Sequence, residues 1–128
     1  MSLEIEVRIQ ETDVPESKLK AELGRLSEDE SKEDLQLTVN AVYCGGVDQV
    51  DRIAKALVRL SKPHWRLVLW VAFSGLEDVP ESVWELANLE ELRLNNNKLK
   101  TISPAIAKLT KLRRLWIGWN SFAGFPEA

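Results

Sequence analysis

Cys44 and His64 are the residues of this chain whose types are most often used in nucleophilic catalysis or metal binding. Cys44 follows an expected strand and precedes Gly45, Gly46 and an expected helix, where a helix N-terminus can stabilise a thiolate. The stretch CGGVDQVDR has no arginine at the spacing of a CxxxxxR phosphatase loop, and His64 lies 20 residues further on. A cysteine-dependent enzyme is therefore the most distant alternative, and we interpret Cys44 as a buried structural residue.

The other residues that could support chemistry form no recognisable constellation. The sequence has no GxGxxG, GxxxxGK[ST] or HExxH motif and no spaced set of Cys and His ligands. Glu90 and Glu91 are adjacent, so on a strand we expect their carboxylates on opposite faces, where they cannot flank one substrate atom. We therefore predict a protein without catalytic residues, cofactor or metal.

Length and composition indicate one globular domain, spanning residues 1–128. The chain is 45% hydrophobic and 29% charged, which disfavours disordered and coiled-coil classes. No run approaches the roughly 18 apolar residues that a membrane span needs. The opening MSLEIEVRIQETD alternates charged with apolar residues and so lacks the apolar core of a signal peptide. We expect a cytoplasmic protein.

A repeat of 23 residues organises the second half of the chain. Its units begin at Arg66, Leu89 and Leu112, and the third is incomplete. Four apolar positions recur in phase: the fourth (Leu69, Leu92, Leu115), the sixth (Val71, Leu94, Ile117), the eleventh (Leu76, Leu99, Phe122) and the fourteenth (Val79, Ile102, Phe125). The ninth position holds Ser74, Asn97 and Asn120, and a proline lies at or next to the fifteenth: Pro80, Pro104, Pro126.

These residues resemble the leucine-rich-repeat family, whose pattern LxxLxLxxNxLxxLP is best seen in LEELRLNNNKLKTISPAIAKL. The resemblance covers residues 66–126 and implies short parallel strands that turn at the ninth position and return along a convex side. Arg66 stands where the first leucine is expected, and Ser74 replaces the asparagine of the turn.

The N-terminal half is consistent with longer units of the same kind. EDLQLTVNAVYC alternates like a strand, and apolar residues then recur at helical spacing from Val47 to Leu60, so residues 35–65 form a long βα repeat with Cys44 at its ninth position. Residues 1–34 are a diverged first unit or a cap, with an alternating strand from Leu3 to Ile9 and a helix that contains Leu19, Leu23 and Leu26. The segment SEDESKED, residues 27–34, is expected to be an exposed linker.

The predicted fold is therefore an α/β leucine-rich-repeat solenoid of about five parallel strands, with convex helices in the N-terminal half and short turns in the C-terminal half. Charge does not indicate a nucleic-acid partner. Seven bases and no acid lie from Arg93 to Arg114, but they are scattered over many positions of the repeat, as on a solvated surface. We expect neither a nucleic-acid nor a membrane partner.

Aromatic residues gather at the outward positions of the predicted sheet. Neighbouring strands lie about 4.8 Å apart, so Arg93 is expected between the indoles of Trp70 and Trp116. Trp, Tyr and Arg are common in binding hot spots, which favours a non-catalytic module that binds a protein on this concave face. The predicted binding residues are Tyr43, Trp70, Phe73, Glu91, Arg93, Arg114, Trp116 and Trp119. The alternative is that the aromatic residues pack on one another or under another segment.

The C-terminal strand raises a second possibility. After Pro126 two residues remain, so no returning segment or polar cap covers the last unit. We expect that the chain is a fragment of a longer protein, or that the strand at 113–118 pairs with another chain. A twofold pairing would make a homodimer, and the protein would then be a structural or self-assembly module.

Overall fold

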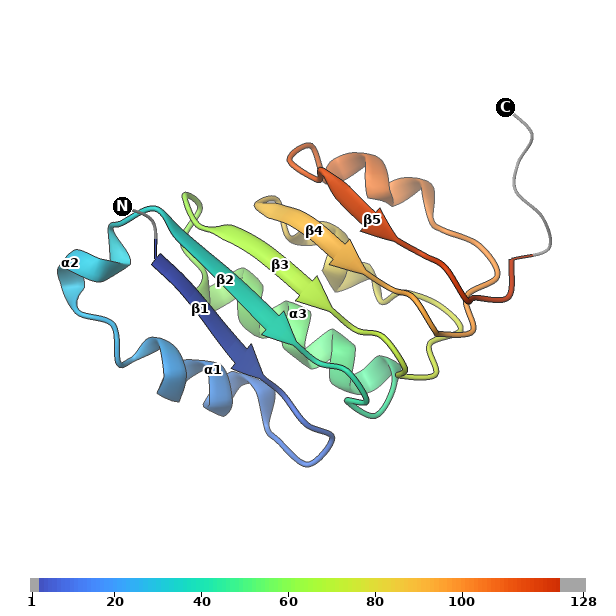
Figure 1. Ribbon diagram of the computed structural model, residues 1–128, viewed down its shortest axis with the longest axis horizontal. Coiled ribbons are helices and arrows are strands. Elements are labelled where there is room, and N and C mark those ends of the chain that lie inside the picture. The colour runs from blue at the N-terminus through green and yellow to red at the C-terminus, as the bar shows by residue number, and fades with distance from the viewer. Residues whose placement is uncertain (1–2, 123–128) are drawn as a thin grey trace.

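The structure is a computed structural model, and it describes residues 3–122. Within that range, five strands form one parallel sheet whose spatial order follows the sequence (Figure 1). The strands are β1 (Leu3–Arg8), β2 (Leu35–Asn40), β3 (Arg66–Trp70), β4 (Leu89–Arg93) and β5 (Arg114–Trp116). The predicted number and direction of the strands are thus confirmed.

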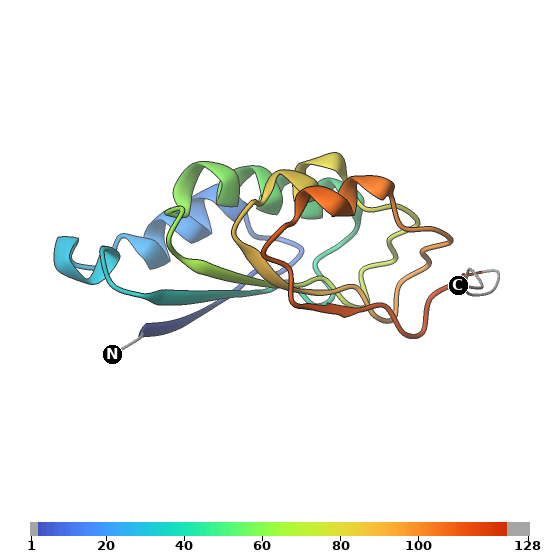
Figure 2. The ribbon, with the colours of Figure 1, turned by 90° about the horizontal axis from the view of Figure 1, so that it is seen from above.

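The segments that connect the strands all return along one side of the sheet (Figure 2). In the N-terminal half these segments contain helices α1 (Pro15–Leu23), α2 (Glu28–Ser31) and α3 (Val47–Leu60). In the C-terminal half they shorten to single 3₁₀ turns, η1 (Glu81–Glu85) and η2 (Pro104–Lys108). The opposite face of the sheet is left open for the side chains that point away from the helices.

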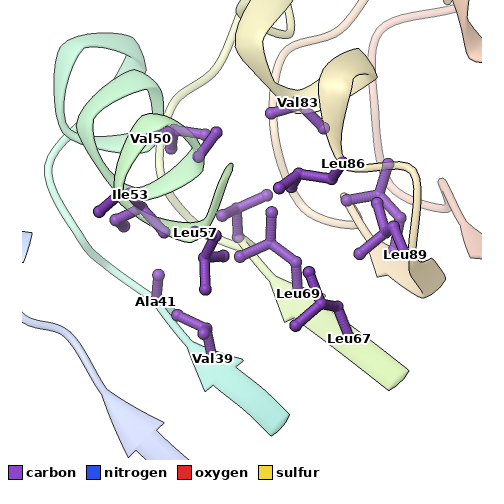
Figure 3. Packing of buried hydrophobic residues seen from close by; sticks show 14 of the residues in the cluster. Val39, Ala41, Val50, Ile53, Leu57, Leu67, Leu69, Val83, Leu86 and Leu89 are labelled. Carbon is purple, nitrogen blue, oxygen red and sulfur yellow. The ribbon is translucent and has the colours of Figure 1, made fainter. Parts of the chain in front are cut away.

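The hydrophobic core lies between the sheet and the returning segments. Figure 3 shows Ile53 and Leu57 of α3 packed over Val39 and Leu69, the inward residues of β2 and β3. The alternating burial along β2 explains its sequence pattern, because every second side chain enters this layer. Trp65 and Trp84 are also buried and add their rings to this core.

The ninth position of each repeat satisfies backbone groups where the chain turns. The side chain of Asn97 donates from Nδ2 to the carbonyls of Val71 and Leu94, both at 2.9 Å. Its Oδ1 accepts from the N–H groups of Ser74 at 3.0 Å and Leu76 at 3.2 Å. One amide thus serves two consecutive repeats, and this is why a short, bifunctional side chain is needed there.

Cys44, Ser74 and Asn120 occupy the same position in the other repeats, as predicted. The hydroxyl of Ser74 donates to the carbonyl of Ala72 at 3.2 Å, and its Oγ lies 3.4 Å from Cys44 Sγ. Asn120 donates to the carbonyls of Leu94 at 2.9 Å and Ile117 at 2.8 Å. We call Cys44, Ser74, Asn97 and Asn120 the turn ladder. Its hydrogen-bonding capacity increases from the cysteine to the two asparagines.

Residues 27–34 are not simply an exposed linker, because residues 28–31 form the helix α2. Ser27 accepts from the N–H of Glu30 at 3.0 Å, and the Glu30 carboxylate accepts from the N–H of Ser27 at 2.9 Å. The hydrogen bond from the backbone N–H of Ser27, followed by a contact with the Ser27 side chain, holds the pKa of the Glu30 carboxylate below its ordinary value. The segment remains largely exposed, so the difference lies in its local conformation.

Candidate concave binding face

The middle of the open face is a stack of a guanidinium between two indoles. The strand register places Trp70 opposite Arg93 and Arg93 opposite Trp116. The guanidinium carbon of Arg93 lies 4.1 Å from the centre of the Trp70 ring and 5.1 Å from that of Trp116. The geometry expected from the sequence is therefore present. We call these three residues the stacked column.

Carboxylate contacts neutralise the charge of the stacked column. Glu91 lies on the same face, with 11% of its side chain exposed. Its Oε2 accepts from Arg93 Nε at 2.5 Å, and its Oε1 lies 3.7 Å from Arg114 Nη1. Arg93 and Arg114 thus share the Glu91 carboxylate, so the guanidinium between the two rings is not an unpaired charge.

Aromatic side chains also occupy the eighth position of the repeats, where the strands end and the chain turns. The backbone there is left-handed, with φ values of 60° at Tyr43, 54° at Phe73, 60° at Asn96 and 57° at Trp119. The rings of Tyr43 and Phe73 stack at 5.1 Å between centres with an angle of 24° between planes. We call Tyr43, Phe73 and Trp119 the aromatic rim. Left-handed backbone suits asparagine and is costly for bulky side chains.

The exposed aromatic side chains of the described surface are concentrated on this face. The exposed aromatic side chains of residues 3–122 are those of the rim and Trp116, with Trp119 exposed to 82%. The other large apolar residues that are exposed there are three valines and Leu115. Trp70 is half-buried, and its indole N–H has no hydrogen-bond partner among the described residues.

A polar hollow lies beside the stacked column. Its lining contradicts the expectation that Glu90 and Glu91 lie on opposite faces of the strand. Glu90 and Glu91 both line this hollow of about 270 Å³ instead of standing on opposite faces. The reason is a register shift: Leu67 pairs with Leu89 but Val68 pairs with Glu91, so Glu90 is an extra residue. The hollow is also lined by Gln36, Arg66, Val68, Arg113 and Arg114.

Within residues 3–122, the hydrogen-bond contacts of Cys44 are with Ser74, and no catalytic partner lies beside it. Its side chain is fully buried in the turn ladder, which is the position that the sequence predicted. His64 is exposed near the start of β3, and its Nε2 lies 3.0 Å from the carbonyl of Ser31. Residues 3–122 contain no group of three or more Cys, His, Asp or Glu side chains arranged to hold a metal ion.

No helix in the described part of the chain is long and apolar enough to cross a membrane. Phe125 and Pro126, which the repeat pattern places in the third unit, lie outside the described residues.

Comparison with known proteins identifies the repeats. Residues 87–127 match the family described as "Leucine Rich repeats (2 copies)", and no catalytic family matches. Neither the comparison with curated proteins nor that with solved structures gave a match. Modules of this family are generally protein-interaction modules and are typically non-catalytic. Residues 87–127 thus match two leucine-rich repeats, and the five-stranded parallel sheet, of which β4 and β5 lie in the matched range, belongs to an α/β fold consistent with a leucine-rich-repeat solenoid.

Proposed function

We propose that this chain is a non-catalytic module that binds a protein partner on its concave face, through the stacked column and the aromatic rim. The observation that carries the proposal is where aromatic surface is exposed. Tyr43, Phe73, Trp116 and Trp119 follow or belong to strands of the sheet, whereas the exposed apolar residues elsewhere are smaller. Large aromatic side chains that stay in contact with water are typical of binding surfaces.

The left-handed backbone of the rim supports the proposal independently. Asn96 shows that the eighth position accepts a residue that tolerates this conformation well. A bulky residue in such a conformation costs on the order of 1–3 kcal/mol, and strained residues of this kind concentrate at functional sites. Three aromatic residues at such positions are explained by a gain in binding better than by a gain in stability.

The pairing of Arg93 indicates which partner chemistry suits the face. Because Glu91 already neutralises Arg93, an acidic group on the partner would have to compete with a contact of 2.5 Å. The flat column and the rim instead favour planar and apolar side chains, which stack on rings and bury their area. We therefore expect the partner to contribute an apolar or aromatic segment with few carboxylates.

The test is to immobilise the protein and capture its partner, and to compare the wild type with a rim variant and a control variant. The rim variant carries Tyr43→Asn, Phe73→Asn and Trp119→Asn, which keep a residue suited to left-handed backbone. The control variant carries Val14→Asn and Val58→Asn, which remove exposed apolar residues that are 64% and 49% exposed outside the rim and the stacked column. Circular dichroism and thermal unfolding establish that all three proteins are folded.

We expect the wild type and the control to retain the same partner and the rim variant to lose it. The captured protein is then titrated against the three purified proteins by calorimetry, and we expect the rim variant to bind at least about tenfold more weakly, as for hot-spot residues. Equal affinity of all three proteins would show that the aromatic rim does not bind the partner and would overturn the proposal as stated.

A further inference from the structure

The outer edge of β5 carries apolar surface that the other repeats bury. Leu115 occupies the fourth position, whose equivalents Val39, Leu69 and Leu92 are completely buried. It is 37% exposed, because β5 pairs only with β4 among the described strands. Burial of an exposed core leucine is a driving force for association.

The backbone of β5 indicates which groups face that edge. The carbonyl of Trp116 accepts from the N–H of Leu94, so Trp116 directs its backbone toward β4. Backbone groups of successive strand residues alternate in direction. Leu115 therefore directs its N–H and its carbonyl away from β4, toward the free edge.

These groups suit a twofold axis through Leu115. In an antiparallel pair, two residues that face each other with outward backbone groups exchange two hydrogen bonds. Leu115 would make this pair with Leu115 of a second copy. The neighbouring residues would then be non-hydrogen-bonded pairs, in which Arg114 faces Trp116 of the other copy and Trp116 faces its Arg114. Side chains approach most closely in such pairs.

The chemistry of those pairs repeats that of the stacked column. Arg93 lies between two indoles within one chain, and Arg114 would add a second guanidinium on the other side of Trp116. Trp116 is 49% exposed and the Arg114 side chain 69% exposed, so both are available for this contact. The two edges are thus complementary in backbone, in apolar surface and in cation–π pairing.

The opposite edge of the sheet is a poorer partner for β5. The inward residues Val7 and Ile9 near the carboxyl end of β1 are 1% exposed, so that part of the edge has little apolar surface left to bury. The outward residues Glu4, Glu6 and Arg8 are charged and exposed, a pattern that discourages edge pairing. Two β5 edges together bury two copies of Leu115, whereas β5 against β1 buries one.

We propose that two copies of this chain associate through β5 about a twofold axis at Leu115. Their sheets then form one continuous sheet, in which the two β5 strands are the antiparallel central pair. This contact takes up Arg114 and Trp116, the last residue of the stacked column, and it leaves Trp70 and Phe73 of the concave face for a binding partner. The paired edge is three residues long, so the dimer is weak. We expect a dissociation constant on the order of 10–100 µM.

Sedimentation velocity of the full chain over a concentration series tests the proposal. We expect the average mass to rise from that of one chain toward that of two and to stop there. Leu115→Lys places like charges opposite each other at the axis and should abolish the rise. The matched control Val58→Lys changes an exposed residue of α3 and should dimerise like the wild type.

Cross-linking tests the register. In Leu115→Cys the two introduced thiols would lie in a hydrogen-bonded pair with Cα atoms about 5.5 Å apart, within the range of a disulfide. Copper-catalysed air oxidation should convert this variant to a covalent dimer, whereas Val58→Cys and the wild type, whose Cys44 is buried, should not react. A mass that stays at one chain, a mass that grows past two copies as in head-to-tail assembly, or a dimer that survives Leu115→Lys would each overturn the proposal.

Discussion

Tyr43, Phe73 and Trp119 are held in a backbone conformation that asparagine adopts at lower cost. Asn96 occupies the same position of the fourth unit with the same φ, so the chain itself provides the comparison. Fold stability therefore does not explain the aromatic side chains at this position. Contact with a binding partner explains them better. The cost of each aromatic side chain to folding can be measured with single substitutions.

Trp119→Asn should raise the free energy of unfolding. Trp119 is 82% exposed, so it loses little packing, while asparagine relieves left-handed strain worth about 1 kcal/mol. Urea unfolding followed by circular dichroism gives the difference. Trp119→Ala serves as the control, because alanine lacks the preference of asparagine for this conformation and should gain less. A loss of more than about 1 kcal/mol in Trp119→Asn would mean that the indole packs on the fold.

Cys44 should be unreactive in the native protein. Its side chain is fully buried in the turn ladder, so a thiol reagent reaches it only after the structure opens. We expect native labelling with dithionitrobenzoate to be at least about a thousandfold slower than labelling in guanidinium, in line with a stability of several kcal/mol. Fast labelling of folded protein would contradict the burial and reopen the possibility of a reactive cysteine.

At the scale of elements, the convex side is held together by polar contacts as well as by the core. The hydroxyl of Ser82 in η1 donates to the carboxylate of Asp51 in α3 at 2.6 Å, and Lys55 Nζ lies 3.0 Å from the other carboxylate oxygen. The Ser82 hydrogen bond, followed by the contact with Lys55, lowers the pKa of Asp51 below its ordinary value of 3.8. This contact ties a helix of one repeat to the 3₁₀ turn of the next.

Ser82→Ala should cost about 1 kcal/mol at pH 7, and the cost should shrink in acid. Because the pKa of Asp51 is lower in the folded than in the unfolded chain, its stabilisation is complete above 3.8 and is lost as pH falls through the folded pKa. Urea unfolding at pH 7 and in steps below pH 4 measures this. Ser17→Ala is the matched control, since Ser17 ends an identical DVPES segment but is exposed. An equal cost at all pH values would exclude the Asp51 contact as its source.

Sequence reasoning predicted the elements that obey the period of the repeat and missed those set by local geometry. The strands β3, β4 and β5 and the stack around Arg93 follow from columns spaced 23 residues apart, whereas β1, β2 and the ladder position of Cys44 follow from apolar alternation in longer units. Helix α2 depends on a capping box, and the pair Ser27 and Glu30 was a readable signal for it. The extra residue Glu90 has no such signal, because a register shift depends on how two strands meet.

The candidate site divides in the same way. Periodicity was sufficient to place Trp70, Arg93 and Trp116 beside one another, since the strand register follows directly from it. It did not predict that Glu91 would be buried against Arg93, because that contact depends on side-chain conformations within the face. Nor did it predict the left-handed backbone of the rim, because aromatic residues are not the usual signal for that conformation.

At the scale of the whole molecule, protection of the core decreases toward β5. The strands β2 and β3 each lie between two others, and their inward residues are buried. All three residues of β5 are exposed, including Leu115. In a stack of repeats each unit depends mainly on its neighbours, so an end with one neighbour opens first.

Hydrogen exchange should follow this order. We expect amides of β5 to exchange before those of β4, and amides of β2 and β3 to exchange last, as measured by mass spectrometry of peptides. The experiment is run at low protein concentration, because association through β5 would protect its edge. Equal protection across all five strands would show that the sheet unfolds as a single unit.

The order of the strands also determines how the molecule responds to a pulling force. The strands β1 and β5 stand at opposite ends of the sheet, as Figure 1 shows, with every hydrogen-bonded pair between them in series. A load applied between these two strands pulls neighbouring strands apart sideways instead of sliding them along each other, so the rows of hydrogen bonds open one after another. Each 23-residue unit released would lengthen the chain by about 80 Å, at about 3.4 Å per extended residue. Under such a load the sheet would therefore open in steps, one strand after another.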